Sequence, residues 1–361
     1  MLSCTSFLIV VTHYLLSNHS GSRRYWRNWY RRHRGKQAHM VTVGIIANPS
    51  SGKDIRRIVA QGWVVSNQEK IAIVRRLLRG LEVAGVDHVL FMKESLGIGY
   101  GALETLGETT LRAEVLEMDM LARQEDSTNA ARLMVEYGVT CIITLGGDGT
   151  NRAVFKGCGS RVPLLPISTG TNNVFPEFQE GTTAGLAAGM VATGKVAREH
   201  SCWHSKVLRL YRNGTPVDLA LVDLAISTDN VIGARAIWDV QRLHELFLTR
   251  AQPWSIGLSA IGGMLHPINA REQEGLHMLF GEPGQCVQAA IGPGLFASIN
   301  VREAHTIALD ERIPLHLERP MTLAFDGERD MTAYPSDTLE VVLDADGPWV
   351  VDVHRALTIS R

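Results

Sequence analysis

Residues 139–150 read VTCIITLGGDGT and join a short, β-branched apolar run to a loop that is rich in glycine. A run of this length and composition is typical of a strand that is buried on both faces of a sheet. When such a strand passes through a glycine-rich turn into a helix, the turn is a common site for ligands. The loop consists of Gly146, Gly147, Asp148, Gly149 and Thr150.

Short apolar runs on either side of this stretch predict further strands at 41–47, 88–92, 112–116 and 162–167. Helical patterns lie between them. Ser66 and Glu69 have the spacing of an N-terminal capping box, and Gly85 and Gly138 stand where two helices should end. Ser127 is predicted to cap the second helix. Alternating strands and helices predict a doubly wound α/β domain, whose parallel sheet is covered on both faces. Ligands bind beyond the carboxyl ends of such strands, where the 146–150 loop lies.

The pattern changes after residue 178. A helix rich in Ala and Gly is predicted at 181–194, and a further helical pattern is present at 232–250. Strands are predicted at 207–211, 219–227, 286–291, 304–309, 321–325 and 339–343. We therefore expect an α/β nucleotide-binding domain at 40–178 and a β-rich, sandwich-like second domain at 179–345.

Charge and cysteine content exclude several classes of protein. The chain has 361 residues and a net charge of −1. Residues 1–39 hold seven of its 36 basic residues and no acidic residue, so the 29 that remain face 37 acidic residues and give −8 from Met40 onward. An acidic body makes nucleic acid an improbable partner. The five cysteines form no CxxC pair, which argues against a structural metal and favours the reducing cytoplasm.

The first 39 residues leave two interpretations open. The apolar run at 7–16 is too short for a membrane span, which needs about 20 residues. It also lacks the flanks of a secretory signal. Residues 23–36 interleave Arg with Tyr and Trp, which would suit an interfacial anchor or an RNA-binding arm. The alternative is a disordered or non-native extension, with translation beginning at Met40. We expect the second, and no stable membrane insertion.

The 146–150 loop has the composition of a phosphate cradle. Glycines remove Cβ atoms and permit positive φ, so backbone N–H groups can approach a phosphate, and the helix that follows aims its positive end at the same place. Asp148 stands among these groups. A carboxylate there has a chemical use if it binds Mg²⁺ or accepts a hydroxyl proton. The alternative is an ordinary Asp-Gly turn.

Three other polar loops follow predicted strands. Each can also be read as an ordinary turn, polar loop or hairpin. The first supplies Asn48, Ser51 and Gly52; although Lys53 follows, the loop departs from a P-loop because it lacks the first glycine and has Asp54 after the lysine. The second loop supplies Thr169, Gly170, Thr171 and Asn172. The third supplies Asp326 and Glu328, two carboxylates that could bind Mg²⁺ or act as a base.

Together these loops resemble those of the NAD kinase and diacylglycerol kinase superfamily, and within it the acetoin catabolism protein X family. The similarity extends from Met40 to nearly the end of the chain, and it includes the Ser-Ala-Ile-Gly-Gly segment at 259–263. The resemblance implies ATP in a cleft beside the α/β domain and a C-terminal segment, 346–361, that packs back on that domain. Asp223, after Val222, stands where NAD kinases carry an Asn-Glu pair, and residues 252–255 replace their Thr-Pro-Thr-Gly-Ser-Thr run.

The predicted function is ATP- and Mg²⁺-dependent phosphorylation of a hydroxyl, the 2′-OH of NAD or NADH. In this reading Asp148, Asp326 and Glu328 are catalytic, with Asp148 or Asp326 also able to bind Mg²⁺. Two alternatives stay open: a kinase of lipids or other small alcohols, and a non-catalytic nucleotide sensor linked to acetoin catabolism. The expected partner is a small molecule, and homo-oligomerisation is left open.

Overall fold

The strands of the first sheet form where the sequence has short apolar runs. A computed structural model describes residues 40–51, 61–63, 65–228 and 240–359, apart from the side chains of residues 329 and 330. The predicted extension at 1–39 and Gly52 lie outside the described residues. The first five strands are β1 (Thr42–Ala47), β2 (His88–Phe91), β3 (Arg112–Val115), β4 (Cys141–Gly146) and β5 (Leu164–Ser168).

The order of strands in this sheet is β3-β2-β1-β4-β5-β17-β6. All neighbours from β3 to β17 (Trp349–Val351) are parallel, and only the edge strand β6 (Cys202–His204) runs antiparallel to β17. The chain moves outward from β1 to β3 on one side and from β4 to β5 on the other. The order therefore reverses between β1 and β4, the point at which doubly wound sheets bind their ligands.

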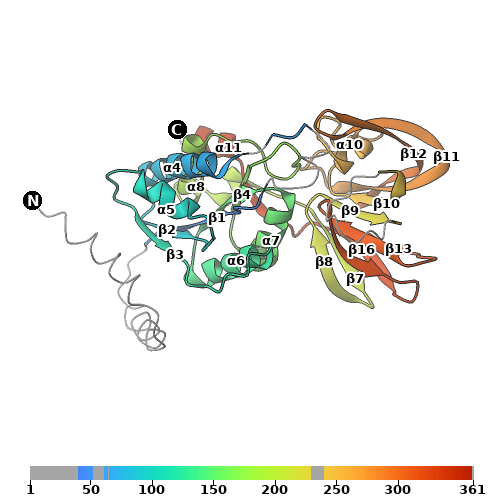
Figure 1. Ribbon diagram of the computed structural model, residues 1–361, viewed down its shortest axis with the longest axis horizontal. Helices are drawn as coiled ribbons and strands as arrows, with labels where there is room; N and C mark the ends of the chain where they lie inside the picture. Colours follow the sequence, from blue (N-terminus) through green and yellow to red (C-terminus); the bar gives the residue numbers. More distant parts are fainter. Residues whose placement is uncertain (1–39, 52–60, 64, 229–239, 360–361) are drawn as a thin grey trace, which may run out of the picture. The chain divides into compact units, whose positions relative to one another are not determined.

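Helices cover both faces of the sheet, as Figure 1 shows. One face packs against α4 (Asn67–Ala84), α5 (Ile98–Glu104), α8 (Gly181–Ala192) and α11 (Val353–Thr358). The other face packs against α6 (Glu125–Tyr137) and α7 (Asp148–Cys158). A short helix, α9 (Arg198–Ser201), leads into β6. The predicted doubly wound α/β domain is confirmed.

The helix ends follow the predicted signals with one exception. The Ser66 side chain accepts a hydrogen bond from the backbone N–H of Glu69, and Gly85 and Gly138 end α4 and α6 with φ of 86° and 85°. The prediction that Ser127 caps α6 is wrong, because the helix begins at Glu125 and its N-cap is Gln124. The Ser127 hydroxyl is buried and contacts the sulfur of Met92.

The second domain consists of two antiparallel sheets with orders β12-β11-β10-β9-β14-β15 and β13-β16-β7-β8. Apolar side chains from β7, β9, β14 and β16 share one core, so the sheets pack as a sandwich. A short helix, α10 (Leu258–Gly263), packs on β11. The strands are β7 (Val207–Arg212), β8 (Thr215–Ala220), β9 (Asp223–Ser227), β10 (Leu243–Leu248), β11 (Glu274–Gly292), β12 (Leu295–Ala308), β13 (Arg312–Leu315), β14 (Met321–Phe325), β15 (Glu328–Ala333) and β16 (Leu339–Asp344).

Three expectations for the second half of the chain need correction. Residues 181–204 belong with the first sheet, because α8 packs on α4 and β6 pairs with β17. The helical pattern at 232–250 is wrong for 243–248, which form β10 between β9 and β11; residues 229–239 lie outside the described residues. The single strand predicted at 219–227 is in fact the end of β8 and all of β9, separated at 221–222.

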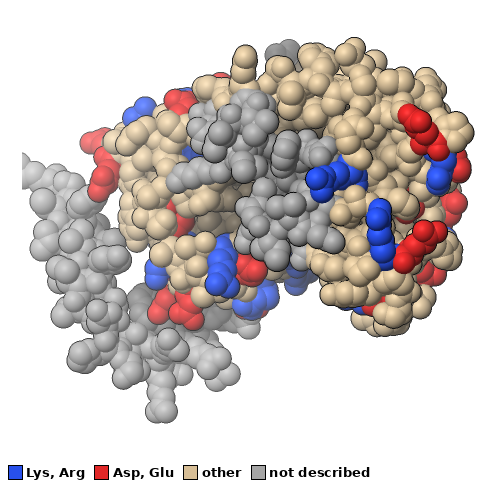
Figure 2. Space-filling view, turned by 45° about the vertical axis from the view of Figure 1, so that its right-hand side comes forward, with Lys and Arg blue, Asp and Glu red and all other residues tan. Residues whose placement is uncertain are grey.

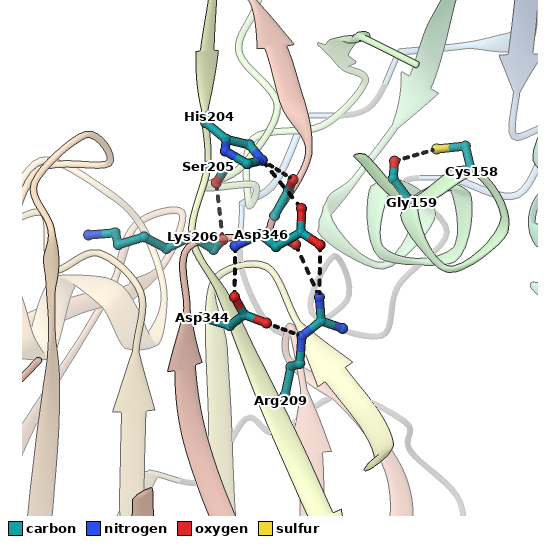
Figure 3. A network of polar contacts seen from close by, with 9 residues as sticks. Cys158, Gly159, His204, Ser205, Lys206, Arg209, Asp344 and Asp346 are labelled. Carbon is teal, nitrogen blue, oxygen red and sulfur yellow. Dashed lines mark hydrogen bonds and ion pairs between the residues drawn. The ribbon is translucent and has the colours of Figure 1, made fainter. Parts of the chain in front are cut away.

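The chain crosses between the two domains at 205–206 and returns at 345–348, and the two crossings are bonded to each other (Figure 3). The backbone N–H of Ser205 donates to Pro348, and that of Gly347 donates to Ser205. The His204 ring lies 2.8 Å from the Gly347 carbonyl oxygen, and Arg209 is paired with Asp344. The expected return of the C-terminal segment to the first domain is confirmed, since β17 and α11 both pack there.

Charged side chains are intermixed on the surface. On the face drawn in Figure 2, Lys and Arg side chains of the described residues lie beside Asp and Glu side chains. Arg312 with Glu340 and Arg132 with Glu136 are examples of ion pairs elsewhere among the described residues. Within the described part of the chain, no helix is long and apolar enough to cross a membrane.

Candidate functional site

The loops after β1 and β4 are bonded to each other at the switch point of the sheet. The backbone N–H of Asn48 donates to the carbonyl of Leu145 over 3.0 Å. The Asn48 side-chain amide donates to the hydroxyl of Thr150 over 2.9 Å. These bonds hold the first predicted loop against the glycine-rich loop, as the sheet order requires.

A third loop, 168–175, closes on the other two. The hydroxyls of Ser51 and Thr169 lie 2.9 Å apart. The Asp148 carboxylate accepts hydrogen bonds from the backbone N–H groups of Val174, at 3.1 Å, and Phe175, at 2.8 Å. Asp148 is 9% exposed, so these bonds lie largely out of water. Three loops that are far apart in sequence therefore form one polar surface.

The glycines of the 146–150 loop act by lacking a Cβ atom. Positive φ occurs at other glycines but not at Gly146, Gly147 or Gly149, so that part of the expectation is wrong. A Cβ on Gly147 would lie 2.6 Å from the side-chain oxygen of Asn173, and one on Gly149 would lie 2.7 Å from a carboxylate oxygen of Glu328. Both positions are closed to a larger residue unless its neighbours move.

Helix α7 begins at Asp148, with Gly147 as its N-cap. Its first turn is fixed by Asn151, which donates to the Gly147 carbonyl over 2.9 Å and accepts from the Thr144 hydroxyl at 2.6 Å. The positive end of the helix dipole thus faces the space beside the three loops. An anion such as a phosphate is stabilised in that position.

The second domain contributes Asp326 and Glu328 from one hairpin. Asp326 and Gly327 form its two-residue turn, with φ of 52° and 76°, between paired residues Phe325 and Glu328. The Asp326 carboxylate is buried and accepts hydrogen bonds from the backbone N–H groups of 221–223. Asp223 in turn accepts from Gly327 over 3.1 Å.

Burial raises the pKa of the Asp326 carboxyl to about 7, although the nearby Arg152 guanidinium opposes the shift; the Asp148 charge adds to it. Asp148 and Asp326, from different domains, therefore lie close enough to repel one another. Glu328 lies nearer the glycine loop, beside Gly149. The hairpin thus places one carboxylate in the protein interior and a second at the loop.

Three basic residues of this region are buried, although the sequence gives no indication that they belong to the site. The Lys70 ammonium is buried and donates to the carbonyls of Asn48 and Ser51. Arg152 on α7 bonds the Leu219 carbonyl and Asp218, and its guanidinium lies 4.7 Å from the centre of the Phe325 ring. The contacts of Arg152 join the first domain to the second. A buried cation has no distinct pattern in sequence, because most Lys and Arg residues are exposed.

Arg250 is the third of these cations and is only 2% exposed. Burial lowers the pKa of its guanidinium to about 10, while the carboxylates of Asp148, Asp326 and Glu177 oppose the shift. The group therefore stays charged at neutral pH. It supplies positive charge next to the acidic residues from both domains.

The remaining predicted residues lie in the same region, but their contacts differ. The Gly170 carbonyl accepts from the Ser168 hydroxyl over 2.8 Å, which shapes the third loop. Thr171 lines a cleft beside that loop, and Asn172 is half-buried. Among the described residues, no three His, Cys, Asp or Glu side chains are grouped in a way that could hold a metal ion.

Comparison with known proteins matches the two halves separately. Residues 43–196 match the ATP-NAD kinase N-terminal domain, and residues 206–346 match the acetoin catabolism protein X C-terminal domain. Among solved structures, a Bacillus anthracis str. Sterne protein assigned as a diacylglycerol kinase is 15% identical, with a TM-score of 0.48 over 87% of this chain and 97% of its own. An NAD kinase from Archaeoglobus fulgidus in complex with ATP is 11% identical, with a TM-score of 0.37 over 88% and 96%.

A curated relative resembles the chain far more strongly in sequence. The acetoin catabolism protein X of Cupriavidus necator is 39% identical over 315 residues, which cover 83% of this chain and 87% of that protein. The resemblance inferred from the four loops is thereby confirmed. The chain belongs to the acetoin catabolism protein X family, with an N-terminal domain of the ATP-NAD kinase kind.

Proposed function

We propose that this protein transfers the γ-phosphoryl group of ATP to a hydroxyl of a small molecule, the 2′-OH of NAD or NADH. One observation carries the proposal. The glycine loop at the N-terminus of α7 is bonded to two other loops at the switch point, and a carboxylate from the second domain, Glu328, lies against Gly149. Phosphoryl transfer depends mainly on positioning phosphates and neutralising their charge, and this arrangement suits both.

The residues present fit a nucleotide phosphate. The missing Cβ atoms of Gly147 and Gly149 let Asn173 and Glu328 approach the loop, and the first turn of α7 offers its positive end beside them. We assign phosphate binding to the backbone of Gly146, Gly147, Gly149 and Thr150. The 48–51 loop and residues 169–172 would contact the rest of the nucleotide. When bound, Mg²⁺ would neutralise charge on the phosphates, and it is commonly held by one or two carboxylates.

The proposed catalytic carboxylates are Asp148, Asp326 and Glu328. Asp148 and Asp326 each accept backbone N–H groups, from Val174 and Phe175 and from 221–223 respectively. Their remaining capacity would orient the acceptor hydroxyl or the metal. Glu328 lies beside the glycine loop, and we assign it the largest share of the metal or base role.

The choice of acceptor rests on the match of residues 43–196 to the ATP-NAD kinase domain. A kinase of lipids or other small alcohols is the alternative of the same class. It would use the same loops, because they recognise the donor. The two kinds of kinase would then differ only in the residues that contact the acceptor, in the second domain and beside the 168–175 loop.

A nucleotide sensor without catalysis is the second candidate, and a specific observation favours it. Both Asp148 and Asp326 have backbone hydrogen bonds that fix loops in place, as expected of structural carboxylates. The family name would then reflect a regulatory role in acetoin catabolism. A sensor would bind ATP at the same loops without transferring phosphate.

One experiment separates these candidates. Purified protein is incubated with ATP and Mg²⁺ and with NAD, NADH or a short-chain diacylglycerol, and ADP release is measured. We expect turnover with NAD or NADH, and a loss of at least about 100-fold in Glu328→Gln, in the range for removing a catalytic acid–base or charged group. Turnover with diacylglycerol alone would establish the lipid alternative. ATP binding without turnover on any acceptor would establish the sensor.

A further inference from the structure

A cleft of about 940 Å³ lies beside the 168–175 loop, which Asp148 also contacts. Asn173, Val174 and Phe175 belong to both regions, because they line the cleft and also contact Gly147 or Asp148. Residues from the second domain and from β17 and α11 complete its walls. A ligand in this cleft would therefore lie next to the proposed phosphate loop. None of the proposed catalytic carboxylates lines the cleft, so the ring and the anionic group of an acceptor would lie in it while the hydroxyl to be phosphorylated extends past Val174 to Asp148.

Aromatic side chains are concentrated along the cleft. Trp254 and Phe178 both line it and are 69% and 57% exposed, so their rings are accessible to a ligand. Phe178 also contacts Trp63, with ring centres 6.2 Å apart. Exposed aromatic rings beside a cleft are suited to stacking on the planar ring of a ligand.

Arg250 adds a buried positive charge to the same cleft. Its Nη2 donates to the Ser205 hydroxyl over 3.0 Å, but its Nε is buried and has no hydrogen-bond partner among the described residues. The guanidinium lies 5.2 Å from the ring centre of Phe175 and 5.6 Å from that of Trp203. A buried donor without a partner is costly, and an anionic group of a ligand would satisfy it.

We propose that this cleft binds the phosphoryl acceptor, and that Arg250 and Trp254 select an acceptor with both a planar ring and an anionic group. Trp254 stacks on the ring, and Arg250 attracts the anionic group. Arg271, which also lines the cleft and is partly exposed, adds positive charge that Asp352 partly offsets. A neutral, aliphatic acceptor such as a diacylglycerol would use neither feature. This inference rests on the proposed function, because it assigns the second substrate of the same reaction.

The test uses the full chain saturated with a non-hydrolysable ATP analogue and Mg²⁺, so that further ligands bind only outside the donor site. Titration calorimetry then measures the affinity for NAD, for adenosine, which lacks an anionic group, and for dioctanoylglycerol. We expect Trp254→Ala to weaken NAD binding at least tenfold. The matched control Phe296→Ala removes another exposed aromatic ring, 65% exposed on β12, and should stay within twofold of wild type.

Arg250→Met should weaken NAD at least tenfold but adenosine less than threefold, and Arg250→Lys should recover part of the loss. If the buried Arg250 variants do not fold, Trp254→Ala still decides the proposal. Unchanged NAD binding in folded Trp254→Ala, no binding of NAD to wild type, or tighter binding of dioctanoylglycerol would overturn it. If Trp254→Ala lost as much affinity for the ATP analogue as for NAD, the proposal would also be overturned, because the cleft would then bind the phosphoryl donor.

The two proposals fail in different ways. If NAD binds as expected but ADP is never released, the proposed kinase function fails and the assignment of the cleft stands. If an acceptor is phosphorylated with the same KM in wild type and Trp254→Ala, the cleft assignment fails and the kinase function stands.

Discussion

The backbone N–H of Phe175 donates a 2.8 Å hydrogen bond to the carboxylate of Asp148. The bond connects the glycine loop after β4 to the loop after β5, and Phe175 also lines the cleft. Asp148 is therefore positioned to affect both folding and chemistry.

Replacing Asp148 by Asn should reduce stability as well as turnover. The charged acceptor of two backbone N–H groups is lost, and hydrogen bonds to charged groups contribute about 1.5–3 kcal/mol. We expect the free energy of unfolding to fall by about 1–2 kcal/mol and turnover to fall by about 100-fold. Denaturant unfolding and ADP release measure the two effects. A variant of wild-type stability would show that the carboxylate is not an anchor of the 168–175 loop.

Asp326 should make stability depend on pH. Its pKa is raised from 3.8 to about 7 by burial, so between these values the folded state binds more protons than the unfolded state. The contribution of this group to stability is then highest at low pH and falls as pH rises towards 7, by up to about 1.4 kcal/mol per pH unit. Above that pH it is constant.

Asp326→Asn removes the titration but keeps an oxygen for the backbone N–H groups of Leu221 and Val222. We therefore expect the variant to be at least as stable as wild type at pH 8, and the difference to shrink or reverse at pH 5. Denaturant unfolding at the two pH values measures this difference. The same difference at both would mean that Asp326 does not titrate in this range.

Gly147→Val should weaken ATP binding while leaving the fold intact. The new Cβ would stand 2.6 Å from the Asn173 side-chain oxygen, so Asn173 must move and lose its bond to Ser168. Because the displaced group is the end of a side chain, the strands on either side should keep their positions. We expect ATP affinity to fall at least tenfold, about 1.4 kcal/mol, by calorimetry. Wild-type affinity in a folded variant would exclude phosphate binding at this glycine.

The sequence predicts the first sheet well because its signals are local. Short apolar runs and nearby capping residues identify β1, β4 and α4 without reference to distant parts of the chain. In contrast, the separation of β8 from β9 falls within the stretch 219–226, LALVDLAI, which is apolar except for Asp223 and contains no Gly or Pro. There the backbone N–H groups of Leu221 and Val222 donate to Asp326, more than 100 residues later, so no local pattern marks the break.

In the candidate site, too, local features could be predicted from the sequence, whereas long-range contacts could not. Its four loops are recognisable because glycines and small polar residues follow predicted strands. Their mutual contacts, such as Asn48 with Thr150, follow from the order of the sheet. The buried cations Lys70 and Arg250 were missed, because only tertiary packing distinguishes them from exposed basic residues. β10 was missed for a similar reason: its state depends on pairing with β9 and β11.

A last prediction separates stability from function in the second domain. Glu245 on β10 and His277 on β11 are both 5% exposed, and their Oε1 and Nε2 atoms lie 2.5 Å apart. The His277 ring also stacks on Phe247, with ring centres 4.2 Å apart. His277→Phe alone leaves the buried Glu245 carboxylate without this partner, and Glu245→Met leaves His277 with the exposed His305, whose Nε2 lies 3.0 Å from its Nδ1. Each single change should cost about 3 kcal/mol or more.

The double variant pairs two apolar side chains and keeps an aromatic ring on Phe247. It should recover most of that loss, because replacing a whole buried polar pair by apolar groups is often neutral. Denaturant unfolding of the four proteins gives the coupling energy, and kcat/KM should be unchanged in every folded variant, since neither residue lies in the loops assigned to ATP or the acceptor. If the losses of the two single variants add up in the double variant, the interaction between Glu245 and His277 contributes nothing to the free energy of unfolding. A fall in kcat/KM in the stable double variant would mean that this sheet takes part in the reaction.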